Sequence, residues 1–165
     1  MKGLGTALIT PFTENGTIDY QALSTLIEYQ IAGQVDYLVV LGTTSEVPTL
    51  TLAEQDAIIS FVVKQVAGRV PLILGVGGNS THAVVERIGE LRERLTRDFA
   101  AILSVTPYYN RPQQEGLFQH FCAIATASPI PVLLYNVPKR TGVNMLPETT
   151  RRIYDAHPEK IMGIK

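Results

Sequence analysis

The sequence contains a single cysteine, no tryptophan and almost no excess of charge. Because Cys122 has no partner cysteine, an internal disulfide and a CxxC metal site are excluded, and its thiol is expected to be buried in a reducing compartment. The net charge of −1, from 14 basic and 15 acidic residues, predicts no binding surface for nucleic acid or an anionic membrane. No apolar run approaches the roughly 20 residues of a membrane helix, and the N-terminus shows no signal peptide. We therefore expect a soluble, cytoplasmic protein.

What the sequence does contain is an alternation of short apolar runs with longer amphipathic segments. Continuous apolar runs are typical of strands buried on both faces, and parallel strands need a long, usually helical, connection between them. Asp19 is the predicted cap of the first helix, and Thr51 with Glu54 forms a capping box at the second. The runs that predict strands are residues 7–9, 37–41, 71–76, 101–105, 131–134 and 161–164. The segments that predict helices are residues 19–33, 51–67, 80–95, 114–127 and 147–154.

This alternation indicates an α/β fold, either an open doubly wound sheet or a (β/α)8 TIM barrel. The doubly wound sheet requires a G-x-G-x-x-G loop after the first strand, where the sequence has Thr10-Pro11-Phe12. The glycine-rich residues 75–79 follow the third strand instead, so the barrel is favoured. A whole barrel takes about 250 residues, whereas these 165 residues supply about the first six strands. We interpret residues 1–165 as the N-terminal part of a single (β/α)8 barrel domain, truncated after strand six.

Polar residues follow the carboxyl ends of the predicted strands. In a barrel these ends lie on one face, and active sites are built there. Any one of these residues could instead cap a helix or bond to loop backbone, but the set as a whole indicates a site. Its members are Thr10, Thr43, Thr44, Asn79, Tyr108, Tyr109, Tyr135, Asn136 and Lys165.

Lys165, at the end of the last predicted strand, is the candidate nucleophile. A lysine amine whose pKa is lowered by burial attacks a carbonyl to form a Schiff base, although a lysine here could also simply begin a surface loop. Tyr135 is the available acid or base, and the hydroxyls of Thr43 and Tyr109 can relay its proton. The three histidines lie in or beside predicted helices and are interpreted as surface or packing residues: His82, His120 and His157.

Arg140, shortly after Tyr135, either binds a carboxylate through two hydrogen bonds or is a solvated loop residue. The sequence has neither paired carboxylates nor the spacing of metal ligands, so metal-dependent aldol chemistry is not expected. We predict no cofactor site and no metal site.

Four motifs together carry a resemblance that spans the whole chain. They are Gly42-Thr43-Thr44-Ser45-Glu46, Thr106-Pro107-Tyr108-Tyr109-Asn110, Tyr135-Asn136-Val137-Pro138-Lys139-Arg140-Thr141-Gly142 and Gly163-Ile164-Lys165. In these motifs the sequence resembles the dihydrodipicolinate synthase / N-acetylneuraminate lyase family of class I aldolase-like barrels. The resemblance implies a lyase of lysine and diaminopimelate biosynthesis, which needs no cofactor because its substrate pyruvate forms the Schiff base. It also implies a homotetramer, built as a dimer of dimers.

The resemblance further implies a role for each site residue. Lys165 would form the Schiff base with pyruvate, and Tyr135 would shuttle protons, relayed through Thr43 and through Tyr109 reaching across the tight dimer interface. The enamine of pyruvate would attack L-aspartate-4-semialdehyde, and the new amine would displace Lys165 by cyclising. The residues implied to bind the substrate carboxylates are Thr44 for pyruvate and Arg140 for the semialdehyde.

The sequence departs from the family pattern at two places. Ser45 stands where the family usually has the second glycine of a GTTGE loop, and a left-handed backbone there would cost about 1 kcal/mol. Members that lysine inhibits bind it with a His and a Glu, which this chain lacks at the matching positions, so weak or absent lysine inhibition is expected. Those positions are Leu52 or Gln55, and Ala83, while Asn79 and Tyr108 are kept.

Two alternatives to this interpretation are a lyase of another substrate in the same family and a non-catalytic barrel. Sialic-acid lyases of the same family usually have Ser-Thr in place of Thr43-Thr44, and they lack the match to Arg140. A non-catalytic binding barrel would have no need to keep four such groups aligned. The four are Thr43, Tyr109, Tyr135 and Lys165.

Overall fold

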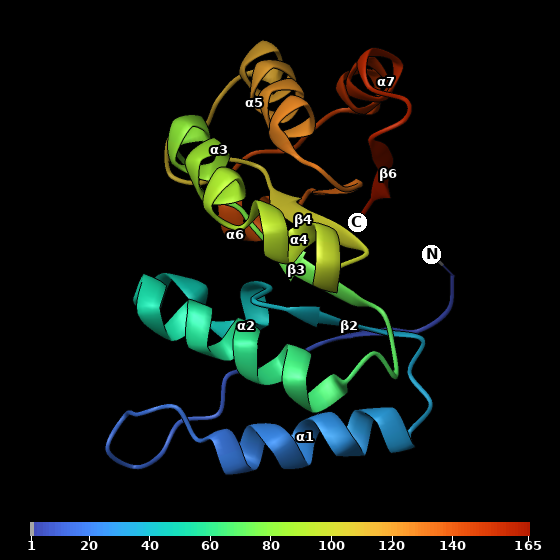
Figure 1. Cartoon of the computed structure of the whole chain (residues 1–165). Coiled ribbons are helices and arrows are strands. Elements are labelled where there is room, and N and C mark those ends of the chain that lie inside the picture. The colour runs from blue at the N-terminus through green and yellow to red at the C-terminus, as the bar shows by residue number, and fades with distance from the viewer. Residues whose placement is uncertain (1) are drawn as a thin grey trace. The chain divides into compact units, whose positions relative to one another are not determined.

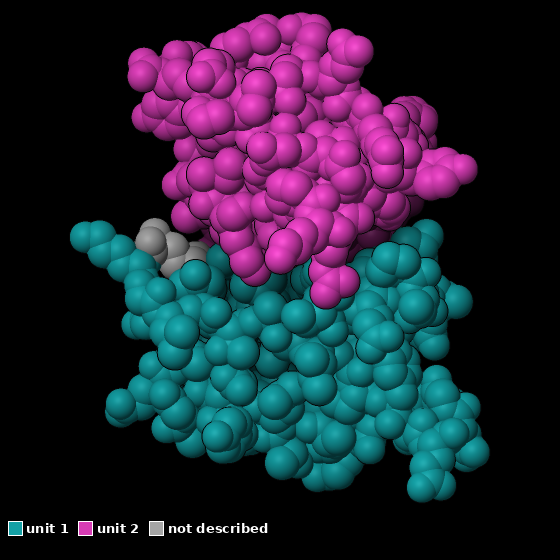
Figure 2. Space-filling model, turned by 180° about the vertical axis from the view of Figure 1, so that it is seen from behind, with its two compact units in different colours: residues 1–75 teal, residues 76–165 magenta. Residues whose placement is uncertain are grey.

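The computed structural model describes residues 2–165, which form two compact units. Among the described residues, unit 1 comprises residues 2–75 and unit 2 comprises residues 76–165 (Figure 2). In each unit, parallel strands are connected by helices (Figure 1). This arrangement in each unit is the one that the alternating apolar and amphipathic segments predict.

Unit 1 contains three parallel strands and two long helices. Strand β1 pairs with β2 in the register Gly5 with Tyr37, and β2 pairs with β3 in the register Leu38 with Leu72. Two short 3-10 turns, η1 and η2, follow β2. In chain order the elements are β1 (Gly5–Ala7), α1 (Tyr20–Ala32), β2 (Tyr37–Val40), η1 (Thr43–Ser45), η2 (Val47–Thr49), α2 (Leu52–Val66) and β3 (Leu72–Gly75).

The two long helices of unit 1 begin where their capping residues predict. The Asp19 carboxylate accepts the Ala22 N–H at 2.8 Å at the start of α1. At α2, the Thr51 hydroxyl accepts the Glu54 N–H at 3.2 Å, and the Glu54 carboxylate accepts the Thr51 N–H at 2.8 Å. This reciprocal capping box satisfies N–H groups that the first turn of a helix leaves unbonded. Helix α2 ends as Ala67 adopts a left-handed conformation, with φ 49°.

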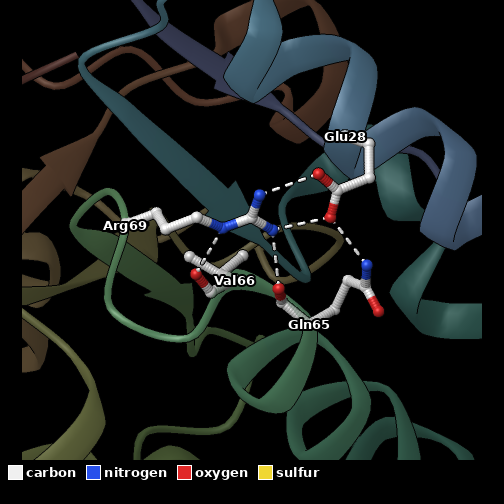
Figure 3. A network of polar contacts seen from close by, with 4 residues as sticks. All are labelled: Glu28, Gln65, Val66 and Arg69. Carbon is white, nitrogen blue, oxygen red and sulfur yellow. Dashed lines mark hydrogen bonds and ion pairs between the residues drawn. The ribbon is translucent and has the colours of Figure 1, made fainter.

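A polar network joins α1 to the end of α2 (Figure 3). The two terminal nitrogens of Arg69 donate to the two carboxylate oxygens of Glu28 at 2.6 and 2.7 Å, and the Gln65 amide donates to the same carboxylate at 2.7 Å. The Arg69 guanidinium, assisted by Gln65, lowers the pKa of the Glu28 carboxyl to about 2. Because both charged side chains are partly exposed, we read this contact as a fixed helix–helix register rather than as a large source of stability.

Unit 2 contains the other three strands, again parallel. Strand β4 pairs with β5 in the register Val105 with Tyr135, and β5 pairs with β6 in the register Leu134 with Ile164. Helices α3, α5 and α7 lie side by side in unit 2 (Figure 1). In chain order the elements are α3 (Thr81–Glu90), α4 (Arg92–Asp98), β4 (Ala101–Val105), α5 (Gln114–Ala127), β5 (Val132–Tyr135), α6 (Pro138–Thr141), α7 (Pro147–Ala156) and β6 (Ile161–Ile164).

Buried apolar side chains fill each unit as the apolar periodicity predicts. In unit 1, Leu23 and Ile27 of α1 are buried, as are all of Leu38–Val40 in β2. In unit 2, Leu117 and Phe121 of α5 are fully enclosed. Among residues 2–165, no helix combines the length and the apolar character needed to span a bilayer.

Several sequence-based boundaries differ from the structure. The first strand is Gly5–Ala7 rather than residues 7–9. It ends at Ala7 because Leu8 bonds to the neighbouring strand through its N–H alone, which donates to the Val39 carbonyl. The helix expected over residues 80–95 is interrupted at Leu91, whose ψ near 0° separates α3 from α4. Cys122, expected to be buried, is only half-buried on α5.

Helix α6 was not expected from the sequence. It is a single turn, and Pro138 occupies its first position, where the fixed φ of proline suits a helix and the missing N–H costs nothing. Gly142 ends it in a left-handed conformation with φ 69°. A turn this short has too few residues to show an apolar period, so only the Pro and Gly at its ends could have indicated it.

Candidate active site

Lys165 and Tyr135 are held together by the ladder between β5 and β6. The Lys165 N–H donates to the Leu134 carbonyl at 2.8 Å, and the Asn136 N–H donates to the Lys165 carbonyl at 3.0 Å. The Lys165 Nζ lies 5.0 Å from the centroid of the Tyr135 ring. An ammonium at this distance is attracted to the face of the ring. The candidate nucleophile and the candidate acid or base are therefore neighbours, as the strand-end argument predicts.

Unit 2 does not bury the Lys165 amine. The Lys165 side chain is exposed and the Tyr135 side chain is half-buried. On the same strand, Met162 and Ile164 are 39% and 47% exposed. This exposure is unusual, because parallel strands of α/β folds are generally buried on both faces. The apolar enclosure that the sequence argument requires around the amine is thus absent from residues 76–165.

Tyr109 extends from the loop after β4. The loop is anchored at its start by the Thr106 N–H, which donates to the Tyr135 carbonyl at 3.0 Å, and further along by the Asn110 amide, which donates to the Asn79 carbonyl at 2.7 Å. Between these anchors Tyr109 has φ 70°, a conformation that costs an aromatic residue energy, and its side chain is 88% exposed. Within unit 2, Tyr109 makes no polar contact with Lys165.

Arg140 lies on the one-turn helix α6, directly after the strand that ends in Tyr135. Its N–H donates to the Val137 carbonyl at 2.9 Å, and its side chain is exposed. The next residue, Thr141, is buried, and its hydroxyl donates to the carbonyls of Val137 and Val143 at 3.2 and 3.0 Å. These bonds fix the backbone of α6, and the Arg140 side chain on it is exposed to solvent.

Thr43 and Thr44 belong to unit 1, in the 3-10 turn η1 after β2. The Thr44 hydroxyl donates to the Leu8 carbonyl at 3.1 Å, whereas the Thr43 hydroxyl makes no hydrogen bond to any of residues 2–165. The Thr43 hydroxyl is therefore available to pass a proton. The Thr44 hydroxyl is already used, although its oxygen can still accept a hydrogen bond.

Ser45 does not adopt the left-handed backbone conformation that would strain the loop. Its φ is not positive; the left-handed residues are Leu41 before it, with φ 53°, and Glu46 after it, with φ 55°. Ser45 is only 2% exposed, and its hydroxyl donates to the Leu8 carbonyl at 2.7 Å. A glycine is therefore not required at this position, and the serine adds a buried hydrogen bond.

One anchor of this site was not foreseen from the sequence. The Gln114 amide, at the start of α5, donates to the Asn144 carbonyl at 2.9 Å and accepts the Leu146 N–H at 3.0 Å and the Thr149 hydroxyl at 2.6 Å. It thus fixes the segment between α6 and α7. Nothing in the sequence distinguishes Gln114 from other polar residues at a helix start, because its three partners are about 30 or more residues away.

The chain contains no candidate metal site within the part that the structure describes, residues 2–165, since no three His, Cys, Asp or Glu side chains gather there.

Known proteins match this chain over its whole length. The model of the dihydrodipicolinate synthetase family matches residues 1–165. A 4-hydroxy-tetrahydrodipicolinate synthase from Parabacteroides distasonis is 58% identical over 153 residues, which are 93% of this chain and 50% of that protein. The enzyme of the same name from Bacillus subtilis is 48% identical over 150 residues, which are 91% of this chain and 51% of that protein. The chain thus spans about half the length of these curated relatives.

Solved structures show the same similarity. The 4-hydroxy-tetrahydrodipicolinate synthase from Methylacidiphilum fumariolicum SolV superimposes with a TM-score of 0.92 and 41% identity, covering 100% of this chain and 53% of that one. Dihydrodipicolinate synthase from Aquifex aeolicus gives a TM-score of 0.91 at 41% identity and covers 100% of this chain and 55% of that one. The predicted fold class, an α/β barrel of which this chain carries six strands, is confirmed. The chain belongs to the dihydrodipicolinate synthetase family.

Proposed function

We propose that this protein is a 4-hydroxy-tetrahydrodipicolinate synthase, which condenses pyruvate with L-aspartate-4-semialdehyde in lysine and diaminopimelate biosynthesis. The observation that carries the proposal is the Lys165 Nζ, 5.0 Å from the Tyr135 ring centroid at adjacent strand ends. The names of relatives up to 58% identical support it, and Arg140, exposed on α6, favours a second substrate that carries a carboxylate. In this proposal both units belong to a single barrel domain.

In the proposed mechanism, the neutral Lys165 amine attacks the C2 carbonyl of pyruvate. The resulting carbinolamine loses water to give the imine, and Tyr135 supplies the proton that the departing hydroxide needs. Loss of a methyl proton from C3 then yields the enamine. The free Thr43 hydroxyl and Tyr109 relay protons between Tyr135 and solvent, which is the role that side chains with unbonded or exposed hydroxyls can fill.

The enamine C3 next attacks the aldehyde carbon of the semialdehyde, and a new carbon–carbon bond forms as the aldehyde oxygen takes up a proton. The α-amine of the former semialdehyde then attacks the imine carbon, and the bond to Lys165 Nζ breaks, which regenerates the amine and closes the ring. Arg140 binds the semialdehyde carboxylate through its paired N–H groups, and the Thr44 oxygen with nearby backbone binds the pyruvate carboxylate. No cofactor takes part, because the substrate itself forms the Schiff base.

The oligomeric state is part of the proposal. Tyr109 is 88% exposed at a position with φ 70°, so its side chain is accessible to a neighbouring subunit. We place it across a tight dimer interface, where it completes the proton relay of a neighbouring subunit in a homotetramer. Mixing two inactive variants, Tyr109→Phe and Lys165→Arg, would test this, because hybrid dimers with one intact site should recover activity.

Trapping with borohydride tests the central step. The protein is incubated with pyruvate and sodium borohydride, and the reduced adduct is located by peptide mass mapping. We expect the adduct on Lys165 and its loss in Lys165→Arg. Lys160→Arg is the matched control, because Lys160 stands just before the same strand with its Nζ bonded to the Ser128 carbonyl at 2.9 Å. An adduct that is absent, or that lies on another lysine, would overturn the proposal.

A substrate comparison separates the family's activities. With pyruvate and aspartate semialdehyde the protein should form the cyclic product, and with N-acetylneuraminate it should release no pyruvate. The reverse result, with Lys165 still trapped, would assign the chain to the sialic-acid lyases instead.

A further inference from the structure

Asn136 closes the loop that carries Arg140. Its side-chain amide donates to the Asn144 Oδ1 at 2.9 Å and to the Met145 carbonyl at 3.4 Å, and its Oδ1 accepts the Met145 N–H at 3.1 Å. The two-way pairing with Met145 resembles a pair of strand residues, but one partner is a side chain. The segment 136–145 is thereby drawn into a compact loop whose ends meet, the arrangement of many functional surface loops.

The backbone of the same residue is bonded to the candidate nucleophile's strand. The Asn136 N–H donates to the Lys165 carbonyl at 3.0 Å, and Asn136 directly follows Tyr135. One residue therefore contacts both the strand end that bears Lys165, through its main chain, and the base of the Arg140 loop, through its side chain.

Hydrogen bonds within the loop already fix its interior. The buried Thr141 hydroxyl donates to the Val137 and Val143 carbonyls and accepts the Val143 N–H at 3.3 Å, so the backbone on both sides of Arg140 is fixed within the loop. What remains to be set is the position of the whole loop relative to Lys165. The Asn136 amide is the contact at the loop's base that sets it, and Gln114 holds the outer side.

We infer that Asn136 is a positioning residue for the second substrate: its side chain sets the place of Arg140 relative to the Schiff-base lysine. The inference rests on the proposed function, since it assigns to Arg140 the semialdehyde carboxylate. Because only the Asn136 main chain bonds to Lys165, a side-chain substitution leaves the lysine tether intact and releases the loop alone. Binding of the semialdehyde and trapping of pyruvate should therefore respond differently.

The test uses Asn136→Ala and the isosteric Asn136→Asp, with steady-state kinetics for both substrates and borohydride trapping of pyruvate. In Asn136→Ala we expect KM for the semialdehyde to rise about tenfold or more, the size of the effect of lost supporting contacts around a site, with trapping at Lys165 changed by less than about twofold. Asn136→Asp keeps the acceptor for the Met145 N–H and loses both donors, so its KM should lie between those of the parent and Asn136→Ala.

Two controls make the positioning role specific. Asn144→Ala removes one of the three amide contacts and keeps the Met145 pair, so KM for the semialdehyde should change by less than about threefold. In an Arg140→Ala background, Asn136→Ala should add little further change, because the residue it positions is already gone.

The outcomes separate this inference from the function beneath it. If the parent protein neither traps pyruvate at Lys165 nor turns over the semialdehyde, the proposed function fails. If the parent does both, but Asn136→Ala and Asn136→Asp leave KM for the semialdehyde unchanged, or reduce trapping in the same proportion, the positioning role of Asn136 is wrong while the function stands.

Discussion

The Thr81 hydroxyl and the His120 Nδ1 lie 2.8 Å apart and join α3 to α5 beneath the surface of unit 2. His120 is 2% exposed, and its Nε2 has no hydrogen-bond partner of standard geometry among residues 2–165. The buried hydroxyls of Ser104, on β4, and of Thr106, directly after β4, likewise have none. Burial without a partner at Nε2 favours the neutral form of the His120 imidazole.

Acid should destabilise the protein through His120. Burial lowers the pKa of His120 from its ordinary value of 6.5 to about 4, and the Val105 backbone opposes the shift only in part. The unfolded chain binds the proton first, so the stability due to neutral His120 is complete above about pH 6.5 and is lost as the pH falls toward 4. Linkage over this shift gives about 3 kcal/mol at most, and about 2 kcal/mol by pH 5.

Urea unfolding midpoints at about pH 7.5 and pH 5 measure this effect. His120→Gln should be less stable than the parent at neutral pH and should lose less stability on acidification. His82→Gln, which removes an exposed histidine of α3, should retain the pH dependence of the parent. Equal pH dependence in His120→Gln and the parent would assign the acid sensitivity to other groups.

Tyr135→Phe should slow Schiff-base formation without preventing the pyruvate adduct. The phenyl ring keeps the contact with the Lys165 ammonium, since the 5.0 Å separation is measured to the ring itself. Only the hydroxyl that exchanges protons is lost, and general acid–base catalysis contributes about 10²–10⁴-fold to a rate. Single-turnover trapping with pyruvate should show a decrease in that range. Tyr154→Phe, at an exposed position of α7, should match the parent. An unimpaired Tyr135→Phe would remove Tyr135 from the mechanism.

Helix caps and helix bounds could be predicted from the sequence where the interacting groups lie within a few residues of each other. The Asp19 cap, the Thr51–Glu54 capping box and the bounds of α5 at Gln114 and Ala127 agree with the structure. Each depends on groups three or four residues apart, so no tertiary contact has to be known.

Most features that depend on contacts between distant residues could not be predicted from the sequence. The Lys165–Tyr135 pair could be anticipated, because parallel strand ends share one edge. The conformation of Ser45 could not, since its hydroxyl is held by Leu8, and neither could the closure of the loop by Asn136, which needs the backbone of Met145. The exposure of Lys165 also differs from the expected burial, because the residues that would enclose its amine are not supplied by unit 2.

Lysine should inhibit the protein weakly or not at all. The resemblance implies that inhibited family members bind lysine through a His and a Glu, whereas Leu52 here is 59% exposed and apolar, and Ala83 carries no polar group. Gln55, the other candidate position, already donates its amide to the Leu50 carbonyl at 3.1 Å. Initial rates should stay unchanged when lysine is added at millimolar concentration. An inhibition constant below about 1 mM, fitted from those rates, would show that other residues form a lysine site.

Ser45→Ala should lower the stability of unit 1, although the resemblance implies a glycine at this position. The Ser45 hydroxyl donates to the Leu8 carbonyl at 2.7 Å from a buried position, and the Ser45 carbonyl accepts the Thr10 hydroxyl at 2.9 Å. Loss of the Ser45 hydroxyl removes one buried hydrogen bond of about 1 kcal/mol. The Thr44 hydroxyl still donates to the Leu8 carbonyl at 3.1 Å.

Urea unfolding compares Ser45→Ala with Ser60→Ala, whose exposed hydroxyl donates to the Asp56 carbonyl at 2.9 Å along α2. The exposed site should change little, because water replaces that bond. Ser45→Gly should be less stable than Ser45→Ala by a few tenths of a kcal/mol up to about 1 kcal/mol, since φ is not positive here and glycine adds only unfolded-state freedom. If glycine instead stabilised the protein, the loop would have to adopt the left-handed conformation at residue 45 that the structure assigns to Leu41 and Glu46.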